Sequence, residues 1–238
     1  MNRRRSAGFR RCGSLPVLGG KALTLWTMVN TLLEGMGKSI LIYFCTLLGA
    51  LPLGLLVAFG RMSKVKPVQL IVKFYISVMR GTPLMLQLMV VFFGPYYLFR
   101  LPTGASYRFI AVIIGFVLNY AAYFAEIYRG GIEGVPVGQR EAAHVLGYSR
   151  ARTFMTIILP QVIKRILPAV TNEMITLVKD TSLAFAISYS EMFTLAKKIA
   201  SSQTTLMPFL IAGIFYYIFN FVVAFVMERL EKRLAYYH

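Results

Sequence analysis

The sequence contains little of what metal centres, disulfide frameworks and catalytic sites are made of. Its 238 residues include two cysteines, two histidines and only 9 acidic residues. Cys12 and Cys45 have no metal-ligand spacing around them, and a single pair of cysteines cannot form a disulfide framework. With His238 as the last residue and His144 inside a short polar stretch, we expect neither a catalytic Ser, His and Asp set nor a metal site.

A phosphate-binding loop is also missing. The stretch GMGKSI ends as such a loop does, with Gly37, Lys38 and Ser39, but the first glycine of the pattern would have to stand at Leu32. An uncharged apolar run follows directly, where the motif requires a strand before it and a soluble helix after it. We therefore expect that this chain binds no ATP.

Apolar residues are abundant instead. Hydrophobic residues make up 57% of the chain and charged residues 15%, which is typical of an integral membrane protein. Residues 39–59 carry no charge and reach the length of about 20 residues that crosses a bilayer. The formal net charge of +17 comes from 26 basic residues, which we assign to loops beside lipid headgroups and not to nucleic-acid binding.

Five membrane crossings are predicted, all of them helical. The four that follow residues 39–59 are residues 68–99, 109–125, 166–189 and 206–227. Residues 68–99 are expected to form one broken crossing, because Arg80, Gly81, Thr82 and Pro83 interrupt the apolar run. Basic residues concentrate in the loops after the first and third crossings and after the fifth, which predicts that these loops and the C-terminus are cytoplasmic and the N-terminus extracytoplasmic.

The first residues do not follow this charge rule. Residues 1–27 place several arginines on the predicted outer face, so we interpret them as an atypical extension or as sequence upstream of the working start. Residues 23–35 are too short and too polar to cross, and are expected to lie in the membrane interface as an amphipathic lead-in. The predicted divisions are a tail with lead-in at 1–37, a transmembrane domain at 38–233 and a C-terminal tail at 234–238.

A polar stretch, QREAAHVLGYSRARTFMTIILPQ at residues 139–161, stands between the third and fourth crossings. Glu141 falls in the first turn of a predicted short helix, where the helix dipole favours an acid. Gly147 is expected to end this helix in a left-handed conformation, and a second helix should begin near Ser149. One small apolar face has the spacing i, i+3 and i+4 and consists of Ala142, Val145 and Leu146.

Two roles are open for this helix on physical grounds. It could lie on the lipid surface, or it could dock in the groove of a partner protein. Ala142 and Ala143 bury too little apolar area for strong membrane anchoring, and small side chains permit the close approach that docking needs.

The same residues carry a family resemblance. The spacing of Glu141, Ala142, Ala143, Gly147, Ile157, Leu159 and Pro160 matches the EAA signature of the permease subunits of bacterial ABC importers. RGTPLMLQL at residues 80–88, AAYFAEIYRGGIEGVPVGQREAA at 121–143 and VKDTSLAFAIS at 178–188 resemble polar amino-acid uptake permeases, which are similar to the histidine and glutamine systems. The resemblance covers residues 38–233.

The resemblance implies a type I importer permease whose EAA loop, residues 129–160, contains a coupling helix that seats in a groove of an ABC ATPase subunit. ATP and Mg²⁺ would be bound by that partner, and this chain would bind no cofactor. A second permease subunit, an extracytoplasmic amino-acid-binding protein and the bacterial inner membrane with its lipid are also implied. The predicted coupling residues are Gly138, Gln139, Glu141, Ala142, Ala143, Leu146 and Gly147.

Polar residues inside the crossings are the remaining signal, because a charge in hydrocarbon is costly unless it faces a cavity or a partner. Two roles are open for them: they could tie helices together, or they could line the path of an amino acid. Glu173, Thr176 and Asp180 should lie along roughly one side of a continuous helix. The candidates for the substrate path are Arg80, Thr82, Asn119, Tyr120, Glu173, Lys179, Asp180, Thr181 and Ser182, with Gln87 as a similar case.

The sequence thus predicts the permease subunit of an ATP-driven amino-acid importer. A passive membrane channel or facilitator, not coupled to an ATPase, is the alternative, and it would need a uniform ring of pore-lining residues and no docking helix. A membrane enzyme would need convergent nucleophile, base or metal ligands.

Overall fold

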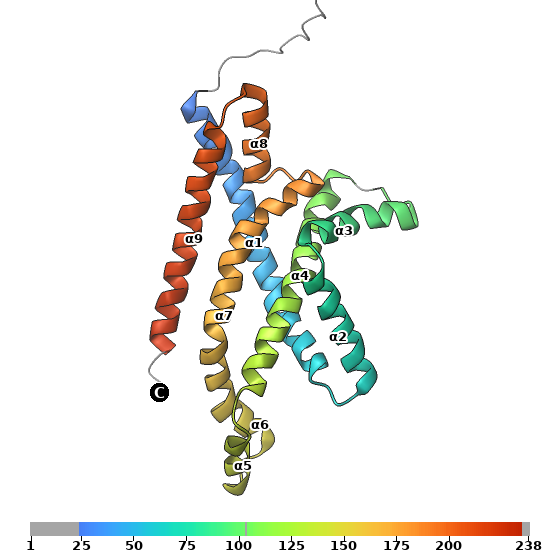
Figure 1. Cartoon of the computed structure of the whole chain (residues 1–238), viewed down its shortest axis with the longest axis vertical. Helices are drawn as coiled ribbons and strands as arrows, with labels where there is room; N and C mark the ends of the chain where they lie inside the picture. Colours follow the sequence, from blue (N-terminus) through green and yellow to red (C-terminus); the bar gives the residue numbers. More distant parts are fainter. Residues whose placement is uncertain (1–23, 103, 235–238) are drawn as a thin grey trace, which may run out of the picture.

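The structure, a computed structural model, describes residues 24–102 and 104–234. The predicted basic tail up to residue 23, which holds Cys12, and the last four residues with His238 lie outside them. Within the described residues all regular secondary structure is helical, which confirms the predicted all-α fold (Figure 1).

The chain runs through nine α-helices, one π-helical turn and one 3₁₀ segment within the described ranges. The first four helices are α1 (Leu25–Arg61), α2 (Lys66–Gly81), α3 (Leu84–Phe99) and α4 (Ala105–Glu133). Two short helices follow, α5 (Val137–Val145) and α6 (Arg150–Thr153), and then the π-helical turn Phe154–Ile158. The remainder consists of α7 (Leu159–Asp180), the 3₁₀ segment Thr181–Ile187, α8 (Met192–Gln203) and α9 (Met207–Leu234).

Four helical segments are long and apolar enough to cross a membrane, and the bent pair α2–α3 makes a fifth when it is counted as one span. The four are Leu25–Arg61, Ser106–Glu133, Arg150–Ile187 and Met207–Leu234. The α1–α2 turn, α5, α6 and the end of α9 lie at one end of the molecule, whereas the start of α1 and α8 lie at the other (Figure 1). The basic loops are therefore gathered at one end, as the charge pattern predicted.

The predicted lead-in and the first crossing form one continuous helix. Thr24 caps a single helix of 37 residues, so the lead-in expected at residues 23–35 is the first part of α1 and no break separates residue 37 from residue 38. Met28 and Leu32 are buried against Met192 of α8 and its neighbours. Packing against α8 therefore stabilises the helical conformation of a segment whose sequence is too polar to predict a membrane crossing. The stretch GMGKSI lies inside this helix and not in a loop.

Helix α4 occupies the centre of the bundle, between α1, α3 and α7 (Figure 1). Its Phe116 and Phe124 are fully buried together with Tyr43 of α1, Leu88 of α3 and Leu177 of α7. α4 therefore buries large apolar side chains against three other helices.

The predicted break at Pro83 is confirmed, and the two halves meet at 111°. Polar side chains bind the main-chain groups that the break leaves free. Gln87 Nε2 donates to the carbonyl oxygens of Met79 at 2.9 Å and Thr82 at 3.1 Å. Asn119 Nδ2 of α4 donates to Gln87 Oε1 at 2.9 Å and to the Met79 carbonyl at 3.1 Å. These contacts satisfy groups that would otherwise be unpaired in an apolar environment.

A buried carboxylate holds α8 against its neighbours. Glu191 is 0% exposed and caps α8, accepting hydrogen bonds from the amides of Phe193 at 2.6 Å and Thr194 at 2.7 Å. It also accepts from the hydroxyl of Tyr216 on α9 at 3.2 Å, and Ser39 of α1 lies beside it at 3.5 Å. One side chain thereby connects three helices.

We predict that Glu191→Ala lowers the free energy of unfolding by about 2 kcal/mol or more, because the substitution removes a helix cap and leaves buried donors unpaired. Thermal unfolding of the detergent-solubilised protein measures this. Glu228→Ala is the matched control, since Glu228 is an exposed carboxylate that pairs with Lys232 within α9. Equal melting temperatures for the two variants would contradict the assigned role of Glu191.

Candidate functional site

The short polar helix predicted from the sequence is present as α5, nine residues from Val137 to Val145. It starts directly after Pro136, two residues before the predicted Gln139. Gly147 ends it at φ +77°, in the left-handed region, as expected. The amide of Tyr148 then donates to the Ala143 carbonyl at 3.0 Å, which closes the helix in the manner of a Schellman motif.

Of the two alanines of α5, one is buried and the other is exposed. Ala143 is 1% exposed and packs into the body of the protein. Ala142 is exposed, and beside it Val145 and Leu146 are 87% and 74% exposed. The predicted apolar face of α5 is therefore uncovered, and it stands at the end of the molecule rather than along the sides of the spans (Figure 1). Exposed apolar side chains in such a position are typical of an interaction surface.

Polar contacts fix α5 to the two spans that flank it. Gln161 Nε2 of α7 donates to Gln139 Oε1 of α5 at 2.7 Å. Arg140 of α5 donates to the Ile132 carbonyl near the end of α4 at 3.1 Å. Arg165 of α7 donates to the carbonyl of Gly134, just after α4.

Apolar packing closes the same junction. Val135, Ile158 and Val162 form a small buried cluster between the end of α4 and the start of α7. Gly131 of α4 lies so close to Ile166 that a Cβ atom at this position would collide with its side chain. Helices α4, α5 and α7 thus form one block, and a displacement of α5 is expected to move both spans.

A π-helical turn leads from α6 into α7. Pro160 has no amide hydrogen and therefore cannot donate to the carbonyl of Thr156, four residues earlier. Just before it, the amide of Leu159 donates to the carbonyl of Phe154, five residues earlier. Such turns are rare and often lie at functional sites.

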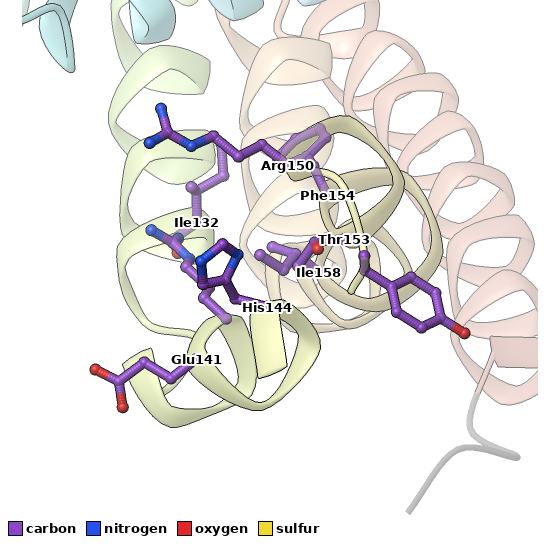
Figure 2. A pocket seen from close by; sticks show the side chains of 9 residues that line it. Ile132, Glu141, His144, Arg150, Thr153, Phe154 and Ile158 are labelled. Carbon is purple, nitrogen blue, oxygen red and sulfur yellow. The ribbon is translucent and has the colours of Figure 1, made fainter. Parts of the chain in front are cut away.

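A cavity of about 510 Å³ opens beside α5 (Figure 2). Ile132 of α4, Phe154 and Ile158 of the π-helical turn and Thr153 of α6 form its floor. Its lining also includes Arg140, Glu141, His144, Tyr148 and Arg150. Glu141 points away from the other labelled side chains (Figure 2).

The polar residues predicted inside the spans fall into two groups. One group is brought together by α2, α4 and α7. The hydroxyl of Tyr120 donates to Asp180 Oδ2 at 2.7 Å, and both side chains are buried or half-buried. Arg80 lies over the ring of Tyr123 at 5.2 Å, the ring centroids of Tyr123 and Tyr120 are 6.2 Å apart, and Glu173 of α7 is half-buried.

The second group makes local or structural contacts. Thr82 and Asn119 belong to the bonds that hold the α2–α3 break. Thr181 and Ser182, at the start of the 3₁₀ segment, donate their hydroxyls to the carbonyls of Val178 and Lys179 at the end of α7. Lys179 is exposed.

Sequence reasoning identified Gln139 and Ala143 of α5 but not the residues of the spans that they and their neighbours contact. Gln161, Arg165 and Gly131 hold the junction, yet none was predicted as a functional residue. Gln161 gave a weak signal, because it is a polar residue directly after the Leu159 and Pro160 of the EAA spacing. The close packing of Gly131 gave none, since its partner Ile166 is 35 positions further along the chain.

We predict that Gly131→Ala destabilises the protein by about 1–3 kcal/mol, because the added Cβ forces α4 away from Ile166. The neighbouring glycine is the matched control: a Cβ at Gly130 meets nothing within 4 Å, so Gly130→Ala should raise stability by up to about 1 kcal/mol through helix propensity. Melting temperatures in detergent compare the two. A Gly131→Ala protein as stable as Gly130→Ala would show that α4 and α7 are not in close contact there.

Known proteins resemble this chain over most of its length. The arginine transport system permease protein ArtQ of Bacillus subtilis (strain 168) is 35% identical over 207 residues, covering 85% of this chain and 92% of ArtQ. The L-cystine transport system permease protein TcyB of the same organism is 37% identical, with 78% of each chain covered. The octopine transport system permease protein OccM of Rhizobium radiobacter is 37% identical over 221 residues, with 87% of each chain covered.

Solved structures agree with the fold. An amino acid ABC transporter crystallised with histidines superposes with a TM-score of 0.81 at 31% identity, covering 89% of this chain and 97% of that one. The MetNI methionine ABC transporter, in an inward-facing conformation, superposes at 0.67 with 16% identity, and shares the fold. Residues 50–236 match the family described as binding-protein-dependent transport system inner membrane component. This chain therefore belongs to that family, the membrane-spanning permease components of ABC transporters.

Proposed function

We propose that this chain forms the translocation path of an ATP-driven amino-acid importer and couples ATP hydrolysis on a separate subunit to alternating access. The relatives named above are permeases for arginine, cystine and octopine, which supports an amino acid as the substrate. ATP and Mg²⁺ are bound by the ATPase partner in this proposal, and the chain itself holds no cofactor.

The observation that carries the proposal is the seat of α5. A short helix with an uncovered apolar face is bonded to α4 on one side and to α7 on the other. An ATPase subunit that binds Ala142, Val145 and Leu146 would therefore displace α4 and α7 together. A coupling helix has to transmit movement of the ATPase to the spans in this way. A passive channel needs no helix that docks on an ATPase.

The remaining partners follow from the same assembly. Closing of two ATPase subunits on ATP would push two coupling helices together, which calls for a second permease subunit, identical or related. An extracytoplasmic binding protein would deliver the amino acid at the opposite end, near α8. The proposed location is the bacterial inner membrane, with the basic loops, α5 and the C-terminus in the cytoplasm and the N-terminus outside.

The proposed substrate path runs past the cluster at Tyr120, Asp180, Glu173 and Arg80. An amino acid carries an ammonium and a carboxylate group. Asp180 and Glu173 can bind the first and Arg80 the second, so the cluster offers both signs of charge within the spans. Thr181, Ser182, Thr82 and Asn119 are weaker candidates, because their hydroxyl and amide groups have structural partners. Lys179 is adjacent to Asp180 and is exposed, as Arg80 is.

We predict that Gly147→Asp abolishes uptake while the protein still inserts into the membrane. A Cβ here meets nothing within 4 Å, and although any side chain is strained at φ +77°, aspartate is among the residues that adopt the left-handed conformation, so the protein should still fold. The added charge lies beside the docking face and should prevent the ATPase from seating. The test is uptake by proteoliposomes that contain matched amounts of protein, with ATP hydrolysis measured in parallel. ATP-dependent uptake by Gly147→Asp at the wild-type level would contradict the proposal. Uptake by the unmodified permease without any ATPase would contradict it as well.

A second prediction concerns the path. Asp180→Asn keeps an oxygen acceptor for the Tyr120 hydroxyl but removes the charge, so it should raise the KM for uptake about tenfold or more without loss of protein. Glu228→Gln, which neutralises an exposed carboxylate at the end of α9, is the control and should leave the KM unchanged. Unchanged kinetics for Asp180→Asn across several amino acids would assign Asp180 to structure.

A further inference from the structure

We propose that the cavity beside α5 receives an acidic segment of the ATPase subunit, with an apolar side chain on the cavity floor and a carboxylate at its rim. This inference rests on the proposed function and extends it. The permease would then not only insert its coupling helix into the ATPase but would also hold a part of the ATPase in a pocket of its own.

The floor of the cavity suits an apolar side chain. Ile132 and Phe154 are half-buried, and Ile158 and Thr153 are 3% and 6% exposed. The volume of about 510 Å³ lies within the range of about 300–1,000 Å³ in which ligand pockets are found. A large apolar side chain of a partner can be removed from water in this cavity without a rearrangement of the helices around it.

The rim of the cavity carries basic groups without acidic partners. Arg140 and Arg150 are exposed, and none of the ion pairs formed among the described residues involves either of them. The imidazole of His144 also lines the cavity, and the lone acid of the lining, Glu141, points away from the other labelled side chains (Figure 2). Guanidinium groups bind carboxylates with two parallel hydrogen bonds, so this rim is complementary to aspartate or glutamate.

The position of the cavity indicates a protein occupant rather than a lipid. α5 and α6 lie beyond the ends of α1 and α9, at the tip of the molecule (Figure 1). The cavity is therefore displaced from the lipid-facing sides of the spans. It adjoins α5, whose uncovered face is the proposed contact with the ATPase, so one partner can occupy both.

The test measures the affinity of the purified cognate ATPase subunit for the full-length permease in nanodiscs. Arg150→Glu should weaken binding about tenfold, since it replaces an attraction to an acidic side chain by a repulsion. Arg233→Glu is the control, an equal charge reversal at the end of α9, at the same end of the molecule, and should change affinity less than twofold. If both reversals weaken binding equally, or neither does, the cavity is not the acidic contact.

Photo-crosslinking separates this inference from the proposed function. A benzophenone side chain in place of His144 reports the cavity, and one in place of Leu146 reports the uncovered face of α5. Both should capture the ATPase subunit, and the peptide captured at His144 should contain aspartate or glutamate. If the probe at Leu146 captures the ATPase but the probe at His144 captures lipid or no ATPase peptide, the inference is wrong and the proposed function stands. If neither probe captures the ATPase, the proposed function is contradicted.

Discussion

The junction of α5 with α4 and α7 is the constraint on which the rest depends. A helix of nine residues is not stable by itself, so α5 exists only because Gln161, Ala143 and the chain ends that flank it hold it in place. Through the same contacts, a force on α5 would be transmitted to α4 and α7. Because α4 also lies at the centre of the bundle, a displacement at the tip reaches the core formed with α1 and α3. A loosely attached loop with an identical sequence could bind a partner but could not transmit its movement.

Buried polar groups have different tasks along the spans. Gln87 and Asn119 satisfy the backbone where α2 and α3 break, and Glu191 ties α8 to α1 and α9. Their hydrogen-bond partners are backbone amides, carbonyls and side chains of the fold, which makes them structural. Asp180 differs in number of partners, because one phenolic hydroxyl donates to it, whereas several donors surround Glu191. A carboxylate with unused acceptor capacity is the kind of group that a passing ammonium group can bind.

The sequence predicts features that depend on local chemistry. Gly147 in a left-handed turn, the break at Pro83 and the helix start after Ser149 follow from backbone preferences, and all three are confirmed. The sequence predicts a lead-in and a separate crossing from residue 39, whereas the structure joins them in one helix, in which Met28 and Leu32 pack against α8. Likewise, the seat of α5 depends on residues distant in the chain, such as Gly131 and Ile166, whose proximity no periodicity reveals. For the substrate path, the sequence predicts the candidates. In the structure Asp180 accepts a hydrogen bond from a phenol, whereas Asn119 donates to the Met79 carbonyl and to Gln87.

The central claim is that the exposed face of α5 lies in the cytoplasm beneath an ATPase. A single cysteine at Val145, in a chain whose Cys12 and Cys45 are replaced by serine, reports this directly through labelling with a membrane-impermeant maleimide. The account predicts labelling in inside-out vesicles, none in right-side-out vesicles, and protection of the cysteine when the ATPase subunit is bound. Labelling from the outer side, or undiminished labelling in the presence of bound ATPase, would contradict it.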